Sequence, residues 1–498
     1  MTLRVRASLA TLGLFATLTL SNPTTSLAAG SCESTKPLTN AVLTKTALPK
    51  GGELLRYQFP PGQANSSGYA GRLTVAKGNL NYFGVTPTHS DFQNAATQED
   101  LASGVKAIVH VNSDFFDFSS LMPYSAIGTS GKLIFAPQGS SPVVGVQLVK
   151  ASSKTGIRAA SKLVSAGRSA TITGLNLPTI GTNSIVAYTA SFSGSKLPSS
   201  TYSIQVSGGR VAKIFNSGSQ VKPQSGYLFS ATGSSVSVLK KFLIGSAASY
   251  KYPSGTIPQL SKDRVTSNGA VSTISGRALA TISAVNLRRD YYQDGVVLFT
   301  DDYSGATPAG AATVVINSSS TVSRLEQNGY PTSVPNGYKV LQFFGSAQSQ
   351  ASRFSLGMKV SVSPSFSSNS GKKYSTVFGV GKSIITNGVN TASCVGNVDT
   401  IRPRTALGWD EAGNVYLATT TMGRDWPDGG QGGYRLGGST VHQMADWLKL
   451  HGATQAVALD GGGSTTMLAL LAGGIKRVDL PEGVWIREIP VGLALTSR

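Results

Sequence analysis

An internal repeat constrains the fold of this 498-residue chain more than any other feature. Residues 172–177 resemble residues 282–287, residues 185–189 resemble residues 296–300, and residues 243–245 resemble residues 355–357. The offset grows only from about 110 to 112 residues. Both copies are rich in Ser, Thr, Gly and Val, which is typical of short β-strands joined by turns. The repeat therefore predicts a duplicated β-unit in the middle of the chain.

The repeat also divides the chain into a sequence of expected parts. Asn176 and Asn286 occupy equivalent places in the two copies, and we expect them to be turn or edge residues. The expected fold class is α+β and β-rich, with a mixed sheet and few helices in a catalytic domain, plus the duplicated unit. The predicted parts are a signal peptide (1–29), the N-terminal part of the catalytic domain (30–150), β-repeat 1 (170–255), β-repeat 2 (280–366) and the C-terminal part of the catalytic domain (374–498).

The N-terminus predicts secretion. Arg4 and Arg6 precede an apolar segment, and residues 26–29 (Ser-Leu-Ala-Ala) resemble a cleavage site for a signal peptidase. No later run reaches the roughly 18 apolar residues of a membrane span, so we expect a secreted, extracellular or cell-wall-associated protein. In an oxidising compartment the simplest expectation for Cys32 and Cys394 is one disulfide, and a lipid anchor on Cys32 is the weaker alternative.

The net charge of +20 indicates an anionic partner. Lys and Arg are scattered along the chain, without a basic block or a motif that reads nucleic acid. We therefore expect a phosphate-containing glycan or wall polymer as the partner and no nucleic acid. Residues 33–70 show no strong period and are predicted to be a leader segment that enters the fold through residues 54–59.

The stretch from Asp460 to Thr466 carries the strongest sign of chemistry. Three glycines follow a carboxylate at the end of an apolar run, and hydroxyl residues come next. Glycines let a ligand approach the backbone, and their N–H groups can converge on an anion. A helix predicted from the Thr440 and Gln443 capping box precedes the apolar run and would place Asp460 at a sheet end. A Gly-rich turn capped by the aspartate is the alternative.

Two further motifs place polar groups beside apolar strands. A strand over residues 104–112 is predicted to be preceded by a short helix that begins near Thr97 and to be followed by Asn112, Asp114 and two phenylalanines. Arg404 leads into another apolar strand, and burying its guanidinium requires an acidic partner or an anionic ligand. An Asn/Asp turn and a structural Arg–Asp pair are the respective alternatives.

Five motifs in order resemble the phosphodiester glycosidase family. They are residues 112–116, 402–408, 423–424, the helix from Thr440, and residues 459–467. This resemblance implies hydrolysis of a sugar-1-phosphodiester on its anomeric side. Two departures bear on the rim of the pocket, since Gly492 stands where the family usually has Asn and Met422 stands where it has an acidic residue.

The resemblance and the residues together give a set of candidate site residues. We expect Arg404 and Arg424, with backbone N–H groups of the glycine stretch, to hold the phosphate. Asp460 or Asp114 would act at the anomeric centre, and Asn112 would hold a sugar hydroxyl. The complete prediction is catalytic Asp460, Asp114 and Arg404, with substrate-binding Asn112, Arg424, Gly461, Gly462, Gly463, Ser464, Thr465 and Arg487.

Other functions stay open at this point. The four histidines lie at no metal-ligand spacing and no zinc motif occurs, so no metal site is predicted. A divalent cation held by Asp114, Asp399 or Asp460 is an alternative. The same anion site would also serve a non-catalytic binding protein for anionic wall polymers or glycans. Further alternatives are a glycosidase for phosphate-free glycans and a phosphodiesterase that cuts the phosphate–acceptor bond.

Overall fold

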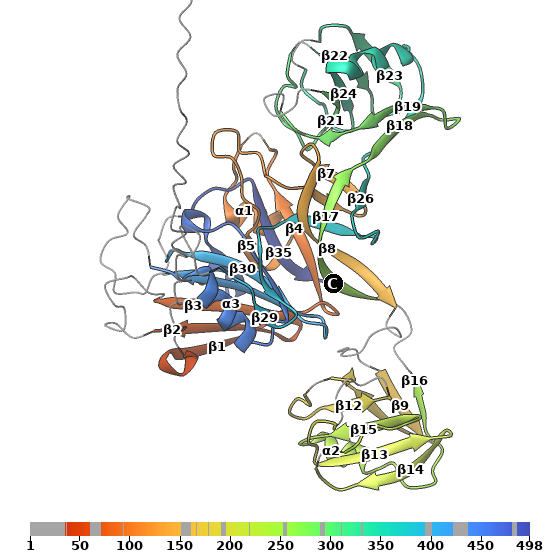
Figure 1. Cartoon of the computed structure of the whole chain (residues 1–498), viewed down its shortest axis with the longest axis vertical. Helices are drawn as coiled ribbons and strands as arrows, with labels where there is room; N and C mark the ends of the chain where they lie inside the picture. The colour runs from red at the N-terminus through yellow and green to blue at the C-terminus, as the bar shows by residue number, and fades with distance from the viewer. Residues whose placement is uncertain are drawn as a thin grey trace, which may run out of the picture.

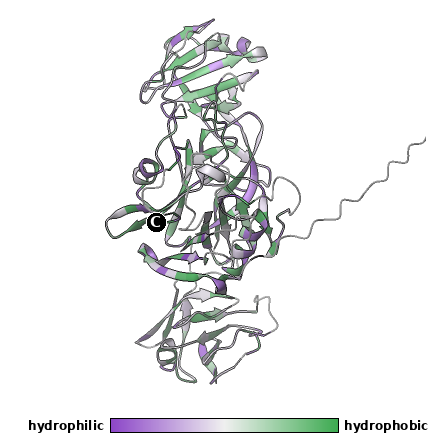
Figure 2. Ribbon diagram, turned by 90° about the vertical axis from the view of Figure 1, so that its left-hand side faces the viewer, coloured by the Kyte–Doolittle hydropathy of each residue, from purple (hydrophilic) through white to green (hydrophobic). Residues whose placement is uncertain are grey.

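A computed structural model of the chain consists of a central body with one small β-unit at each end (Figure 1). It describes residues 35, 37–59, 71–92, 94–150, 161–165, 167–177, 179–190, 196–218, 220–251, 256–288, 294–309, 311–329, 332–393, 401–421, 437–480 and 486–498. Hydrophobic residues concentrate in the strands of all three parts (Figure 2). The predicted β-rich α+β class is confirmed.

The largest sheet of the body has eight strands. Alternate residues of its central strands face an apolar core on one side, where Leu407 and Trp409 pack, and a helix on the other side, where Ala406 packs. The order is β1 (Val42–Leu48), β2 (Gly52–Gln58), β3 (Arg72–Asn79), β31 (Asn414–Thr421), β30 (Arg404–Trp409), β32 (Gln455–Ala458), β28 (Ser383–Thr386) and β29 (Val389–Asn390).

Two more sheets complete the body and share its core. One has the order β34 (Gly474–Arg477), β33 (Met467–Leu471), β5 (Ala107–Asn112), β35 (Val491–Ser497) and β4 (Phe83–His89). The other has the order β26 (Phe366–Ser368), β17 (Thr256–Ser267), β8 (Ser140–Lys150), β27 (Thr376–Gly379), β6 (Ile127–Thr129) and β7 (Lys132–Phe135). Val111 of β5, Val144 of β8 and Leu407 of β30 belong to one buried cluster, so the three sheets pack as one body.

Both predicted helices of the body are present. Thr97 caps α1 (Gln98–Gly104) by accepting a hydrogen bond from the backbone N–H of Asp100. In α3 (Val441–Leu450), Thr440 and Gln443 form the predicted capping box. Met444, Ala445 and Leu448 of α3 pack on the eight-stranded sheet, and Gly452 ends the turn after the helix with a φ of 103°. Short 3-10 turns are η1 (Leu38–Asn40), η2 (Pro49–Gly51) and η7 (Gly462–Ser464).

The two β-units have the same strand order. The first contains β9 (Ser161–Ser165), β10 (Arg168–Ile172), β11 (Gly174–Leu175), β12 (Ile185–Tyr188), β13 (Tyr202–Ser207), β14 (Arg210–Phe215), β15 (Tyr227–Ala231), α2 (Ser235–Leu239) and β16 (Ser249–Lys251). The second contains β18 (Gly269–Thr273), β19 (Ala278–Ile282), β20 (Ala284–Val285), β21 (Gly295–Thr300), β22 (Ala312–Ile316), β23 (Val322–Glu326), β24 (Lys339–Phe344), η5 (Gly345–Arg353) and β25 (Val360–Ser363). Each unit has a five-stranded sheet, β11-β12-β15-β13-β14 or β20-β21-β24-β22-β23, and a three-stranded sheet.

The equivalent asparagines explain part of the repeat. Asn176 and Asn286 both have a positive φ, of 50° and 53°, and both follow a two-residue strand. The amide of Asn176 exchanges hydrogen bonds with Thr189, and that of Asn286 does the same with Thr300. These residues are therefore turn residues, as the sequence predicts.

The units differ in how they join the body. In the second unit, Phe299 and Leu287 share a buried cluster with Phe92 and Phe135 of the body. The first unit has its own buried clusters, against which Ala412 of the body packs. It is inserted between β8 and β17, whose ladder pairs Lys150 with Thr256.

Three details differ from the sequence-based expectations. The predicted leader enters the fold through β2, near the expected residues 54–59, but it also contains β1. Strand β1 pairs with β2, which pairs with β3, and Leu48, Leu54 and Leu55 are buried there. The described ladders of the body are antiparallel, and the parallel pairs β11–β12 and β20–β21 lie in the β-units. The units begin at β9 and β18, earlier than predicted.

The predictions about the cellular compartment depend largely on residues that the structure does not describe. In the described residues, no helix is long and apolar enough to cross a membrane. The predicted signal peptide, Cys32 and Cys394 lie outside the described residues.

Candidate active site

The candidate site forms where the five-stranded sheet of β5 meets the eight-stranded sheet. Asp114 follows β5, and Asp460 follows β32. The backbone N–H of Asp460 donates to the carbonyl of Ser113 at 2.7 Å, and that of Leu459 donates to the carbonyl of Thr405 at 2.9 Å. The first bond joins chain segments about 350 residues apart in the sequence, and the second joins segments about 50 residues apart.

The buried side chain of Asn112 links these segments through hydrogen bonds. Its side-chain N–H donates to the carbonyl of Asp460 at 2.6 Å, and its Oδ1 accepts from the Thr405 hydroxyl at 2.7 Å and the Thr466 N–H at 3.3 Å. The residue is 1% exposed. In this structure Asn112 therefore positions the Asp460 loop, and its predicted contact with a sugar hydroxyl stays a prediction.

The two carboxyl groups have strongly raised pKa values. Burial raises the pKa of Asp114 to about 7, and the charge of Asp460 adds to the rise, while hydrogen bonds from Ser125 and Phe115 oppose it. Burial also raises the pKa of Asp460 to about 6, against the opposing effects of the Ser464 hydroxyl, the Gly461 N–H and the Arg487 charge. Both carboxyls thus exchange protons near neutral pH.

The accessibility of the two carboxyls differs. Asp114 is 3% exposed, and its Oδ2 accepts from the Ser125 N–H at 2.7 Å. Gly379 leaves the room for this carboxyl, because a Cβ there would lie 2.2 Å from Oδ2. Asp460 is only partly buried, and its Oδ1 accepts from the Gly461 N–H at 2.8 Å. Asp460 is therefore the more accessible of the two carboxyls, and Asp114 is the buried one.

A cationic cavity of about 510 Å³ lies beside Asp460. It is lined by Leu459 and Gly461, which flank Asp460, and by Phe115, which follows Asp114. Its charged lining residues are Lys382, Arg402 and Arg404, and none of the described residues that line it is acidic. The cavity therefore has the charge and size to hold an anionic group of a small ligand.

The sequence did not single out two of these cations. Arg402 is exposed, and its backbone exchanges hydrogen bonds with Ser439, just before α3. Lys382 is exposed in the loop before β28. Arg402 belongs to the motif at residues 402–408 and could have been predicted from it. Lys382 reaches the cationic cavity only through the folding of the chain.

The predicted Arg404 and Arg487 both lie near the Asp460 loop. Arg404 donates from Nε to the carbonyl of Ser439 at 3.2 Å, and a Cβ at Gly461 would lie 3.9 Å from its Cδ. The guanidinium of Arg487 lies against Gly463, where a Cβ would be 2.5 Å from Nη2, and over the ring of Phe118 at 5.2 Å. Arg424 lies outside the described residues, so its contact with a phosphate stays a prediction.

The glycine stretch differs from the predicted open nest of donors. The N–H groups of Gly461, Gly462 and Ser464 donate to the Asp460 carboxyl, the Pro403 carbonyl and the Gly461 carbonyl, respectively. Thr465 likewise donates to the Gly462 carbonyl. These bonds hold Asp460 beside the start of β30. In this structure the glycine stretch therefore fixes the position of the Asp460 loop. Its predicted contact with a ligand stays a prediction.

Two remaining expectations concern the rim of the pocket, at Gly492, and a bound divalent cation. At Gly492 a Cβ would lie 2.4 Å from Nε2 of His110, so this buried ring fills the space that a side chain at position 492 would need. Across the described residues, no group of three or more His, Cys, Asp or Glu side chains is placed to hold a metal ion. Asp399, one of the alternative cation ligands, lies outside them.

A family model for phosphodiester glycosidases matches residues 310–496. The predicted resemblance to the phosphodiester glycosidase family is confirmed. The matched part contains Arg404, Asp460 and Arg487, whereas Asn112 and Asp114 precede it.

Comparison with solved structures gives matches at low sequence identity. A hypothetical protein from Synechocystis has a TM-score of 0.51 at 13% identity, with 92% of this chain and 68% of that chain covered. A putative exported protein from Burkholderia pseudomallei has a TM-score of 0.47 at 15% identity, with 90% and 75% covered. The catalytic domain of zebrafish N-acetylglucosamine-1-phosphodiester alpha-N-acetylglucosaminidase, auto-inhibited by its pro-peptide, has a TM-score of 0.30 at 12% identity, with 94% and 87% covered. No curated protein matches the chain.

Proposed function

We propose that the protein is a glycoside hydrolase that cleaves sugar-1-phosphodiesters between the anomeric carbon and the phosphate oxygen. The observation that carries this proposal is the cationic cavity directly beside Asp460. Three cations and no described acidic lining residue suit a phosphodiester, and a reachable carboxyl suits the anomeric centre. The match of residues 310–496 to the phosphodiester glycosidase family supports the same reaction class.

In the proposed mechanism the cations act on the leaving group. Arg404 and Arg402, with Lys382, hold the phosphate oxygens and stabilise the charge that grows there as the glycosidic bond breaks. A phosphomonoester already leaves as a stable anion, so the reaction needs less protonation of the leaving group than an ordinary glycosidase requires.

Asp460 acts on the other side of the breaking bond. In its ionised form it stabilises the positive charge at the anomeric carbon or takes a proton from the attacking water. Arg487 lowers the pKa of Asp460 and so favours the ionised form, whereas burial opposes it. Asp114 acts through Asp460, since it is buried and couples electrostatically to that residue.

Hydrolysis in isotopically labelled water tests this reaction. The protein would be incubated with a panel of sugar-1-phosphodiesters and aryl glycosides in water enriched in ¹⁸O. We expect label in the released sugar and none in the phosphomonoester, because water attacks carbon. Label in the phosphate would instead identify a phosphodiesterase. Release from aryl glycosides alone would identify a phosphate-independent glycosidase, and binding without turnover would identify a binding protein.

We also propose that the protein is secreted and acts on anionic wall, capsular or exopolysaccharide polymers. The charge of +20 and the signal-like N-terminus support this proposal. Expression of the full chain in a bacterial host, followed by N-terminal sequencing, should find a mature protein in the medium that begins near Ala29 or Gly30. Retention of the intact N-terminus inside the cell would contradict secretion.

A further inference from the structure

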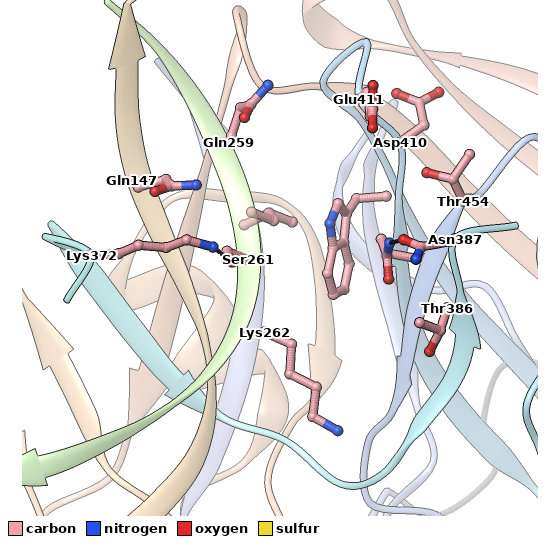
Figure 3. Close-up of a pocket in the computed structure, with 13 residues that line it drawn as sticks. Gln147, Gln259, Ser261, Lys262, Lys372, Thr386, Asn387, Asp410, Glu411 and Thr454 are labelled. Carbon is pink, nitrogen blue, oxygen red and sulfur yellow. Dashed lines mark hydrogen bonds between the residues drawn. The ribbon is translucent and has the colours of Figure 1, made fainter. Parts of the chain in front are cut away.

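A second cavity, of about 340 Å³, lies between the β8–β17 ribbon and the loops at one end of the eight-stranded sheet. In Figure 3, Gln147, Gln259, Ser261 and Lys372 lie on one wall, and Asp410, Glu411, Thr454 and Asn387 lie on the other. On the first wall, Gln147, Gln259 and Ser261 belong to the β8–β17 ribbon that leads into the first β-unit, and Lys372 lies between β26 and β27. The second wall includes the hairpin whose Ala412 packs against that unit.

This second cavity is separate from the candidate active site. The two cavities share no lining residue, although β28, β30 and β32 contribute to both. Arg404, at the first position of β30, lines the candidate site, and Trp409, at its last position, lines the second cavity. Five steps along the strand place their backbones about 16 Å apart.

The fixed charges of the second cavity cancel. Lys262 and Lys372 oppose Asp410 and Glu411. Lys372 donates to the Ser261 hydroxyl at 2.7 Å and Lys262 to the Ser383 hydroxyl at 3.0 Å, so both ammonium groups already have protein partners. The charged residues that line this cavity therefore sum to zero, unlike those of the cationic cavity.

Several polar groups of this cavity have unused hydrogen-bonding capacity. Gln147 and Gln259, which face each other across the β8–β17 ladder, make no side-chain hydrogen bond within the described part of the chain. The Thr454 hydroxyl is buried and likewise has no partner among the described residues. Amides and hydroxyls both donate and accept, as do the hydroxyls of a sugar.

The cavity also has a small apolar surface. Trp409 and Leu260 line it, are each 6% exposed and belong to the core of the body. An indole anchored in this way offers a rigid apolar contact beside the amides. We propose that this cavity binds a neutral saccharide segment, separately from the catalytic step. The inference does not depend on the proposed function, because binding here needs neither Asp460 nor the cations of the candidate site.

Calorimetric titration tests the proposal. The wild-type protein would be titrated with neutral tetrasaccharides of glucose, mannose, galactose or N-acetylglucosamine and with an anionic uronic acid tetrasaccharide. We expect at least one neutral tetrasaccharide to bind, and to bind more tightly than the anionic one. The Gln147→Ala/Gln259→Ala variant should weaken that binding at least tenfold, and Thr454→Val should weaken it severalfold.

Two controls assign the binding to this cavity. Gln348→Ala changes an exposed glutamine in η5 of the second β-unit and should leave the affinity unchanged. Asp460→Asn should also leave it unchanged, even if it removes catalysis, which separates this proposal from the proposed function. Thermal melting would check that each variant folds. If no neutral tetrasaccharide binds, if the anionic one binds more tightly, or if the double variant binds like the wild type, the proposal is overturned.

Discussion

Strands β28, β30 and β32 carry a different chemistry at each end. At the end near Asp460, the described lining residues include three cations and no acid, and two carboxyls with raised pKa values lie alongside. At the other end, two lysines face two acids, and amides dominate the walls. A single sheet thus offers one end suited to charge development and another suited to neutral hydrogen bonding. Charge balance, more than cavity size, distinguishes the two.

Of the changes at the end near Asp460, Asp460→Asn should have the largest effect on catalysis. We expect kcat to fall by at least about 10³, because the substituted amide can neither stabilise a cation by charge nor accept a proton from water. The measurement is sugar release from the best phosphodiester of the panel. Substitution of the exposed Asp294, in the second β-unit, gives a matched control and should leave kcat unchanged. Near-wild-type turnover by a folded Asp460→Asn protein would remove Asp460 from the mechanism.

Arg404→Gln should have the next largest effect. Loss of one charged donor to the phosphate is expected to lower kcat/KM about 10²-fold. Arg277→Gln, at an exposed hairpin of the second unit, is the control and should change little. The wild-type kcat/KM should also fall as salt is added, since the ions screen the cationic cavity. Equal losses on phosphodiesters and on neutral aryl glycosides would contradict a role of Arg404 in phosphate binding.

Asp114→Asn should reveal the cost of a buried carboxylate at the cationic end. Its folded-state pKa, raised to about 7, lies above the unfolded value, so its stability contribution is full below pH about 4 and is lost as pH rises through about 7. At pH 8 the Asn variant should therefore be more stable than the wild type, by up to about 4 kcal/mol. Denaturant unfolding at pH 4 and pH 8 measures this difference.

Asp117→Asn provides a control of opposite sign three residues away. Hydrogen bonds from Ser119 and Ser120 lower the pKa of Asp117 to about 2, so its contribution is present above pH about 4 and is lost as pH falls through about 2. This variant should be less stable than the wild type at pH 8. If Asp114→Asn also loses stability at pH 8, burial does not dominate the titration of Asp114.

The smallest effect is the dependence of activity on pH. Asp460 must be ionised, and burial raises its pKa to about 6. We therefore expect kcat/KM to increase with pH up to about 6 and to fall about tenfold for each unit below that value. Binding of a neutral tetrasaccharide at the other end should show no step near pH 6. A shared step would mean that the two ends are coupled.

Local signals in the sequence predicted much of this arrangement. The capping box of Thr440 and Gln443 and the apolar run before Asp460 are local patterns, and the structure places α3, β32 and Asp460 accordingly. The repeat was visible because equivalent strands kept equivalent turn residues, such as Asn176 and Asn286. These features depend on neighbours within a few residues, so the sequence reveals them directly.

The rest of the site depends on tertiary contacts that no local pattern contains. The sequence did not show that the Asn112 side chain would donate a hydrogen bond to the Asp460 carbonyl. It also did not show that the N–H groups of Gly461 and Gly462 would donate to acceptors within the protein. Lys382 joins the cationic cavity only because β28 pairs with β32. Similarly, the charge balance of the second cavity arises between a ribbon and a hairpin that are far apart in the chain.

The pairing of Lys150 with Thr256 has a consequence for how this architecture can change. The chain leaves the body for the first β-unit and returns to it at adjacent positions of one ladder, so a tight turn could replace residues 151–255 without altering the register of β8 and β17. The first unit is thus a cassette that evolution or engineering can exchange. The second unit cannot be exchanged in the same way, because its removal would expose Phe92 and Phe135 of the body to solvent.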